Sequence, residues 1–234
     1  MCGKTDGAVC GRASLTYPAE GLREELGLAV LPALAPRWNI APTQPIAVVR
    51  AGHGNVLEEL RWGLVPFFSG GPREVGGRWI NARAETIARL PVFRDAFARR
   101  RCLVVVDGFY EWRRDGKQRT PFHLRREDKR PMTFAGVWDR WTSPEDGAVI
   151  ESCSIVTCAS MGSVATLHDR MPVVIAAADR EAWSTGDAEA AAALLVPSDP
   201  HLVLVAVSRA VNDVKNDGPE CQAAPEPPRQ GSLF

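Results

Sequence analysis

The chain has 234 residues, of which 45% are hydrophobic, and its 28 basic side chains equal its 28 acidic ones. A chain of this length and apolarity can bury a full core in one domain, and a net charge of zero argues against a strong non-specific nucleic-acid binder. It contains no run of about 18 apolar residues, the length that a membrane-spanning helix needs. No signal peptide precedes the first cysteine, so a soluble protein without a disulfide framework is expected.

The positive charge is unevenly distributed. Residues 89–130 contain 13 Lys and Arg side chains against 6 Asp and Glu. Only four of the 28 basic residues are lysines, so the charge is carried by arginine, which binds phosphate in a bidentate manner. For this cluster a solvated charged face and a phosphate-contacting surface both stay open.

The amino-terminal region carries nearly the same motif twice, as Met1-Cys2-Gly3-Lys4 and as Val9-Cys10-Gly11-Arg12. Removal of an initiator methionine leaves a cysteine with a free α-amine and a thiol on adjacent carbons. Such a 1,2-aminothiol condenses with an aldehyde to a thiazolidine ring, which an internal cysteine cannot do. Cys102, Cys153 and Cys158 are expected to be small buried hydrophobes. The spacing of the cysteines does not fit a structural zinc site.

Beyond the cysteines, the sequence predicts a short amphipathic helix over 19–28 and a proline-spaced extended loop over 35–43. Apolar runs bounded by turn residues predict strands at 46–50, 56–64, 101–106, 108–113, 120–124, 132–138, 152–157, 173–175 and 202–207. Further helices are predicted at 87–99, 179–185 and 187–195. The sequence therefore indicates an α+β domain built on antiparallel strands, without a dinucleotide-binding fingerprint. Residues 219–234 are rich in Pro, Gln and Glu and predict a disordered tail.

Four segments place polar groups among aromatic or apolar neighbours, namely Trp79–Glu85, Gly108–Trp112, Leu167–Pro172 and Asn212–Asn216. Shorter fragments in the same order are Trp38–Pro42, Arg61-Trp62-Gly63 and Val207-Ser208-Arg209. Together with Cys10-Gly11-Arg12, they resemble the SOS-response-associated peptidase family, whose members process abasic sites and crosslink to single-stranded DNA. The resemblance implies a single β-rich pseudo-barrel with peripheral helices over residues 10–218, between an extension at 1–9 and the tail at 219–234.

In that family the cysteine follows the initiator methionine, and loss of the methionine frees its α-amine. The amine attacks the aldehyde of a ring-opened abasic sugar to give a Schiff base, and the thiol then closes the thiazolidine. Ordinary α-amino and thiol pKa values of about 8 and about 8.5 leave useful fractions of both nucleophiles at neutral pH. Their proximity makes the second addition intramolecular.

Glu111 stands between Tyr110 and Trp112, and an apolar wall of this kind raises the pKa of a carboxyl group toward neutrality. An exposed position on an amphipathic strand is the alternative. By resemblance, Glu111 is the general acid and base, and it supports methionine removal and crosslink reversal. By resemblance also, His168 lies beside the sugar oxygen released on ring opening, and Asn81 orients the amine or the sugar.

The resemblance also implies a DNA surface. Arginine side chains are expected to contact phosphates, and aromatic side chains to stack on unpaired bases, each stack being worth about 1 to 3 kcal/mol. Core packing is the alternative for the tryptophan in this set, and a site-shaping role is the alternative for the asparagine. The candidate DNA-binding residues are Arg12, Asn39, Trp62, Phe67, Phe68, Arg83, Arg170 and Arg209.

The two cysteine motifs leave two candidates for the nucleophile. Alignment with the family places its cysteine at Cys10 and its initiator at Val9, whereas Cys2 follows Met1 in the sequence. A coding start assigned too far upstream explains this, because GTG encodes valine and also serves as a start codon. Cys10 is therefore favoured, and Cys2 on an arm that folds back to the site is the alternative.

The last five residues resemble short peptides that bind the bacterial replication sliding clamp, whose hydrophobic pocket takes a terminal Leu-Phe pair. They predict a clamp contact through Gln230, Leu233 and Phe234. The expected activity is lyase-like DNA–protein crosslinking with autoproteolytic peptidase character, in the bacterial cytoplasm at the nucleoid and without a metal or organic cofactor. A non-covalent single-stranded DNA binder and a cysteine peptidase acting in trans are the alternatives.

Overall fold

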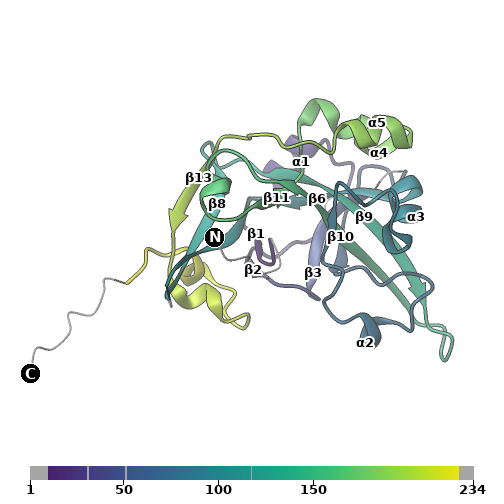
Figure 1. The fold of residues 1–234 in the computed structure, drawn as a ribbon, viewed down its shortest axis with the longest axis horizontal. Helices are drawn as coiled ribbons and strands as arrows, with labels where there is room; N and C mark the ends of the chain where they lie inside the picture. Colours follow the sequence, from purple (N-terminus) through teal and green to yellow (C-terminus); the bar gives the residue numbers. More distant parts are fainter. Residues whose placement is uncertain (1–9, 31, 51, 117, 227–234) are drawn as a thin grey trace, which may run out of the picture.

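The computed structural model describes residues 10–30, 32–50, 52–116 and 118–226, which form two β-sheets with helices around them (Figure 1). The strands are β1 (Ala13–Leu15), β2 (Arg37–Ile40), β3 (Pro45–Arg50), β4 (Leu57–Trp62), β5 (Asn81–Arg83), β6 (Arg101–Val106), β7 (Gly108–Asp115), β8 (Gln118–Arg126), β9 (Met132–Thr142), β10 (Val149–Ala159), β11 (Arg170–Pro172), β12 (Val174–Ile175) and β13 (Leu202–Ala206). The α-helices are α1 (Ala19–Leu26), α2 (Pro72–Val75), α3 (Pro91–Arg99), α4 (Arg180–Thr185) and α5 (Ala188–Ala193). Short 3-10 helices are η1 (Val164–Thr166), η2 (Ala177–Asp179), η3 (Arg209–Asn212) and η4 (Pro219–Gln222).

Five strands of the larger sheet close into a ring. β10 pairs with β4, β4 with β3, β3 with β6, β6 with β9, and β9 pairs again with β10. The β4–β10 pair is parallel and the other four pairs are antiparallel. Closure removes the open edges that a sheet otherwise exposes. The predicted α+β architecture, a β-rich pseudo-barrel with peripheral helices, is thus confirmed.

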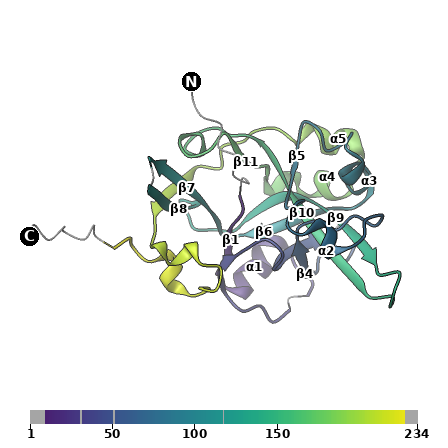
Figure 2. The same cartoon turned by 60° about the horizontal axis from the view of Figure 1, so that its bottom comes forward.

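The second sheet has the strand order β13-β8-β7-β1-β2. It positions two of the candidate catalytic residues, Cys10 and Glu111. β1 follows Cys10, and β7 contains Glu111. In register, Ala13 pairs with Phe109 and Ser14 with Gly108. This antiparallel pairing brings the amino-terminal residues of the described chain to a strand about 100 positions away in sequence, and Figure 2 shows β1 beside the β7–β8 hairpin.

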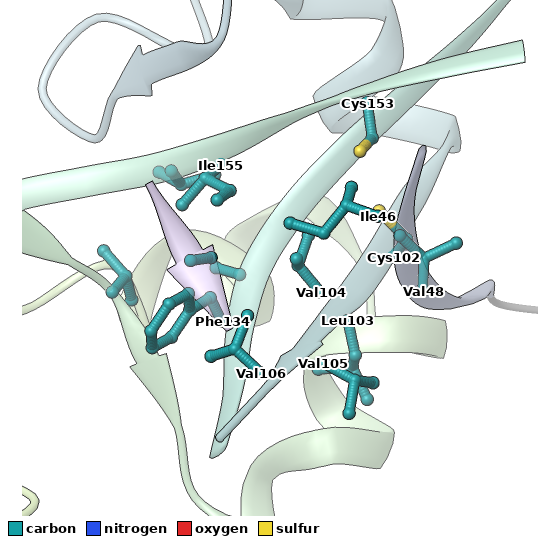
Figure 3. Packing of buried hydrophobic residues seen from close by; sticks show 14 of the residues in the cluster. Ile46, Val48, Cys102, Leu103, Val104, Val105, Val106, Phe134, Cys153 and Ile155 are labelled. Atoms are coloured by element: carbon teal, nitrogen blue, oxygen red, sulfur yellow. The ribbon is translucent and has the colours of Figure 1, made fainter. Parts of the chain in front are cut away.

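The core lies inside the ring of strands. Every residue of β6 is buried, as expected of a strand with packed neighbours on both faces. Figure 3 shows Ile46, Val104, Cys102 and Cys153 gathered from β3, β6 and β10. These two cysteines are fully buried, in agreement with the expectation that they are small core residues.

Helix α3 covers one side of the barrel and illustrates how local sequence sets an element's start. Proline is favoured in the first turn of a helix, and it disfavours helical backbone in the residue before it. The helix accordingly begins at Pro91 rather than at Ile87, where the sequence pattern predicted it. Phe93 and Phe97, one turn apart, form its buried face.

Two predictions about irregular segments are wrong. The loop predicted over 35–43 contains β2, which pairs with β1; its extended backbone was foreseen, but a distant partner makes it a strand. The predicted start of the disordered tail, residue 219, is too early, because Pro219–Gln222 form η4. Cys221 in η4 is fully buried in a small cluster with Tyr110.

The predicted clamp-binding residues Gln230, Leu233 and Phe234 lie outside the described residues, as do Cys2 and the rest of the extension at 1–9. Within the described ranges, none of the helices has the length and hydropathy needed to cross a bilayer.

Candidate functional site

Cys10 and Glu111 form a buried contact at the amino-terminal end of the described chain. The backbone N–H of Cys10 donates a hydrogen bond of 2.8 Å to Oε1 of Glu111. The chain turns at Cys10, whose φ of 47° lies in the left-handed region that residues other than glycine rarely adopt. Two residues after Cys10, directly before β1, the carbonyl oxygen of Arg12 accepts a hydrogen bond of 2.9 Å from the N–H of Tyr110. The pairing of β1 with β7 thus places the Cys10 nitrogen at the Glu111 carboxyl group.

Burial governs the electrostatics of this contact. It raises the pKa of Glu111 to about 7, and the hydrogen bond from Cys10 offsets part of this shift. The expected apolar environment of Glu111 is confirmed, and the alternative of an exposed glutamate is excluded because the residue is only 6% exposed. A carboxyl group with this pKa exchanges protons readily at neutral pH.

The thiol of Cys10 is not activated by its surroundings. Burial, and then the neighbouring Glu111 carboxylate, raise its pKa well above the ordinary value. Low-dielectric surroundings and a nearby negative charge both disfavour the thiolate, so in the chain with residues 1–9 attached the direction of the shift opposes a large thiolate fraction. A reaction at this sulfur needs a base, and Glu111 is the carboxylate beside it.

Asn81 and His168 lie around β10 in the other sheet. Asn81 on β5 is paired with Ile155 of β10, and His168 precedes β11, which runs antiparallel to β10. Nδ1 of His168 accepts the backbone N–H of Arg170 at 3.1 Å and lies 2.7 Å from Oδ1 of Asp169. Its Nε2 atom is buried and has no hydrogen-bond partner among the described residues.

Two of the predicted phosphate-binding arginines form hydrogen bonds with protein groups. Nη1 of Arg12 donates to Oδ1 of Asn39 at 2.7 Å and to the carbonyl oxygen of Val211 at 2.5 Å. Arg170 forms a bidentate pair with Glu85 at 2.5 and 2.9 Å. The Nε atom of each of these two side chains has no partner among the described residues, and their phosphate role stays a prediction.

Asn39 and Trp62 are also structural rather than DNA-facing. Asn39 is fully buried, and its Nδ2 donates to the carbonyl oxygens of Val211, Asp213 and Asn216. Trp62 is fully buried, and its Nε1 donates to the carbonyl oxygen of Ile80 at 3.0 Å. No base can stack on a side chain without exposed surface, so the core-packing alternative for Trp62 holds. The site-shaping role of Asn39 stays a prediction.

Four predicted DNA contacts remain on the surface. Phe67 and Phe68 are 55% and 59% exposed, and their rings meet edge to face with centroids 5.2 Å apart. Arg83 and Arg209 are exposed as well. Arg83 is two residues beyond Asn81 on β5, so the two side chains share a face of the strand.

Sequence reasoning missed a polar cluster formed by Ser14, Asp107 and His123. It lies on the same two chain segments as the Cys10–Glu111 contact, four residues away along each. Asp107 directly precedes the Gly108–Trp112 motif, which was the available signal. Ser14 and His123 carried no local signal, because each stands in an apolar strand pattern and meets its partners only through the sheet.

The fold and the site define a class: a single barrel domain that buries a cysteine against a glutamate, with a histidine and an asparagine on the neighbouring sheet. The profile of the family described as SOS response associated peptidase (SRAP) matches residues 9–214. The chain belongs to this family. The match begins one residue before Cys10.

Curated relatives of this chain share one description. It is 34% identical to "Abasic site processing protein YoqW" of Bacillus subtilis, over 91% of this chain and 98% of the relative. It is 29% identical to "Abasic site processing protein YedK" of Escherichia coli, over 94% and 98%. Identity to "Abasic site processing protein HMCES" of Xenopus tropicalis is 30%, over 72% of this chain and 57% of that protein.

Solved structures support the fold. A protein from Bacteroides thetaiotaomicron superposes with a TM-score of 0.81 at 23% identity, over 92% of this chain and all of that one. A phage-related protein from Bordetella bronchiseptica gives a TM-score of 0.68 at 26% identity, over 86% and 95%.

Proposed function

We propose that this protein processes abasic sites in single-stranded DNA by a covalent thiazolidine crosslink through an N-terminal Cys10. The observation that carries the proposal is the 2.8 Å contact between the Cys10 nitrogen and Oε1 of Glu111. In a chain that begins at Cys10, this nitrogen is the α-amine. The name shared by the relatives, abasic site processing protein, supports the substrate.

The reaction has two bond-forming steps. The amine nitrogen of Cys10 attacks the aldehyde carbon of the ring-opened sugar, and loss of water leaves an imine. The sulfur then adds to the imine carbon, and the thiol proton ends on the nitrogen. Glu111, with a pKa of about 7, accepts the proton from the amine or thiol and returns it to the departing oxygen or to the ring nitrogen. One water is released and no redox partner is needed.

The neighbouring residues have supporting roles in this proposal. In this proposal His168 holds the sugar hydroxyl released on ring opening, through the Nε2 atom that has no partner among the described residues. Asn81 orients the sugar or the amine by hydrogen bonding. Glu111 also serves the hydrolysis that removes the residue before Cys10, since it lies against the nitrogen of that peptide bond.

Cys10 rather than Cys2 is the nucleophile in this proposal. The family profile matches from residue 9, and within the described part of the chain Cys10 is the cysteine whose nitrogen contacts Glu111. With residues 1–9 retained, that nitrogen is an amide and cannot form an imine. The protein produced from its native gene is therefore expected to begin at Cys10.

The test is to incubate the natively expressed protein with single-stranded DNA containing one abasic site and to map any heat-stable adduct by peptide mass spectrometry. An adduct on an N-terminal Cys10 is the expected result. An adduct on Cys2 would overturn the assignment of the nucleophile. Binding that is fully reversed by salt, with no adduct, would favour the non-covalent binder.

Replacement of Arg83 by glutamine is expected to weaken non-covalent binding to undamaged single-stranded DNA. The plot of log K against log salt should lose about 0.7 in slope, the value for one phosphate contact on a single strand. Arg23→Gln on α1 is the matched control, an exposed arginine whose loss should leave the slope unchanged. Equal slopes for wild type and Arg83→Gln would remove Arg83 from the DNA surface.

A further inference from the structure

A buried polar cluster connects β1 to β8 and to Asp107, the residue directly before β7. It is separate from the Cys10–Glu111 contact. Oγ of Ser14 donates to Oδ1 of Asp107 at 2.5 Å and lies 2.9 Å from Nε2 of His123. Thr16 adds its backbone N–H at 2.5 Å and its Oγ1 hydroxyl at 2.7 Å, both donating to Oδ2 of Asp107. Ser14, Asp107 and His123 are each less than one tenth exposed.

The proton positions follow from the inventory of donors. The single proton of the Ser14 hydroxyl goes to the carboxylate of Asp107, so Nε2 of His123 must donate to the Ser14 oxygen. Burial lowers the pKa of His123 to about 4, an effect opposed by Asp107, and the imidazole is neutral at physiological pH. The serine lies between histidine and carboxylate, whereas in a hydrolytic triad the histidine lies between the other two. This cluster is therefore not built to activate a nucleophile.

Glycine at position 108 allows this arrangement. Gly108 on β7 is the register partner of Ser14 on β1. A Cβ atom at Gly108 would lie 2.0 Å from Nε2 of His123, so any side chain there would displace the imidazole. The ring of His123 also packs against Tyr110, with centroids 4.8 Å apart. His123 thus reaches from β8 across β7 to β1 and connects the three strands.

The Ser14–Asp107 contact and the Cys10–Glu111 contact connect the same two chain segments, which pair through β1 and β7. Asp107 and Glu111 are four residues apart on one segment, and their partners Ser14 and Cys10 are four residues apart on the other. β1 has only three residues, and its pairing with β2 contains a register irregularity. Backbone pairing over so short a strand specifies register weakly, and a slip of one residue turns every side chain to the opposite face.

We infer that Ser14, Asp107 and His123 are positioning residues that fix the register of β1 and so hold Cys10 against Glu111. The buried carboxylate selects this register because it must receive its donors from Ser14 and Thr16, and any other register leaves it unsatisfied. The inference rests on the proposed role of Cys10, so its test includes a readout that does not depend on crosslinking.

Two variants test the cluster, Ser14→Ala and Thr16→Val, the second being nearly isosteric and half-buried. Ser154→Ala is the matched control, a fully buried serine on β10 whose hydroxyl has no partner among the described residues. The first readout is amide hydrogen exchange of residues 10–16 in the full chain. Both variants should exchange there at least about ten-fold faster than wild type and the control, because the ladder opens locally.

The second readout is the pH profile of adduct formation on abasic single-stranded DNA by chains that begin at Cys10. Both variants should react at least about ten-fold more slowly, since small displacements of reacting groups are costly. The acid limb of the profile should also move to higher pH. The hydrogen bond from Cys10 lowers the pKa of Glu111, so weakening this contact raises it. Among the described residues, Cys10 is the ionisable neighbour of Glu111.

The two readouts separate the possible outcomes. Unchanged exchange at residues 10–16 overturns the inference, as does a slower reaction with an unmoved pH profile, which indicates general destabilisation. A wild-type protein that forms no adduct overturns the proposed function, and the exchange measurement then decides the positioning role alone.

Discussion

Replacement of Cys10 by serine is expected to reduce heat-stable adduct formation with abasic single-stranded DNA by at least about 100-fold. The variant keeps the α-amine and can still form the imine, but it lacks the sulfur whose intramolecular addition makes the product stable. Trapping with borohydride should therefore recover an adduct from Cys10→Ser that survives heating, whereas the untrapped adduct hydrolyses. The measurement is denaturing gel electrophoresis of labelled DNA with and without the reductant.

Cys102→Ala is the control for this experiment. Cys102 is as deeply buried as Cys10, and burial raises the pKa of its thiol as well, but it lies on β6 inside the barrel. Its replacement removes a buried thiol without touching β1, so the yield of adduct should remain at the wild-type level. Full activity of Cys10→Ser without reductant would show that Cys10 is not the nucleophile.

Replacement of Glu111 by glutamine is expected to slow adduct formation by about 10²- to 10⁴-fold, the usual contribution of a positioned general acid or base. The amide keeps an oxygen for the Cys10 nitrogen but cannot take up its proton. In wild type the rate should change with an apparent pKa near 7, the value to which burial raises Glu111. This inflection should be absent from the profile of Glu111→Gln.

The same substitution tests the burial of Glu111 through stability. Its pKa in the folded protein is about 7 against an ordinary value of 4.5, so folding favours the protonated form. The stabilisation that this provides is complete below about pH 4.5 and is lost as the pH rises through about 7. Relative to Glu111→Gln, the free energy of unfolding of wild type should fall by about 3 kcal/mol between pH 4.5 and pH 8. Urea denaturation of both proteins at the two pH values measures this difference, and parallel changes would contradict a buried carboxyl group.

The sequence by itself determined the parts of this protein that depend on short stretches of chain. Apolar runs between turn residues predicted the barrel strands, including β6 at its observed bounds. The aromatic neighbours of Glu111 predicted a carboxyl group with a raised pKa, because adjacent residues on a buried strand share its environment. The ordered set of motifs from Cys10 onward identified the family, which the profile match over residues 9–214 confirms.

The tertiary structure decided which of these side chains are available for chemistry. Arg12 donates hydrogen bonds to Asn39 and to Val211, the second 199 residues away, and Arg170 pairs with Glu85, 85 residues away. An arginine bound to phosphate and one bound to protein look alike in a sequence, because the partner comes from a distant segment. Folding also buried the Cys10 thiol and raised its pKa.

The Ser14–Asp107–His123 cluster also depends on tertiary structure rather than on local sequence. Ser14 and His123 are separated by 109 residues and meet only because β8, β7 and β1 are neighbours in one sheet. Strand periodicity determines which residues of a strand share a face, but the choice of neighbouring strand is made by the burial of the whole core. Local pattern therefore determined most of the elements, and the packing of distant strands decided which side chains are buried and which partners they meet.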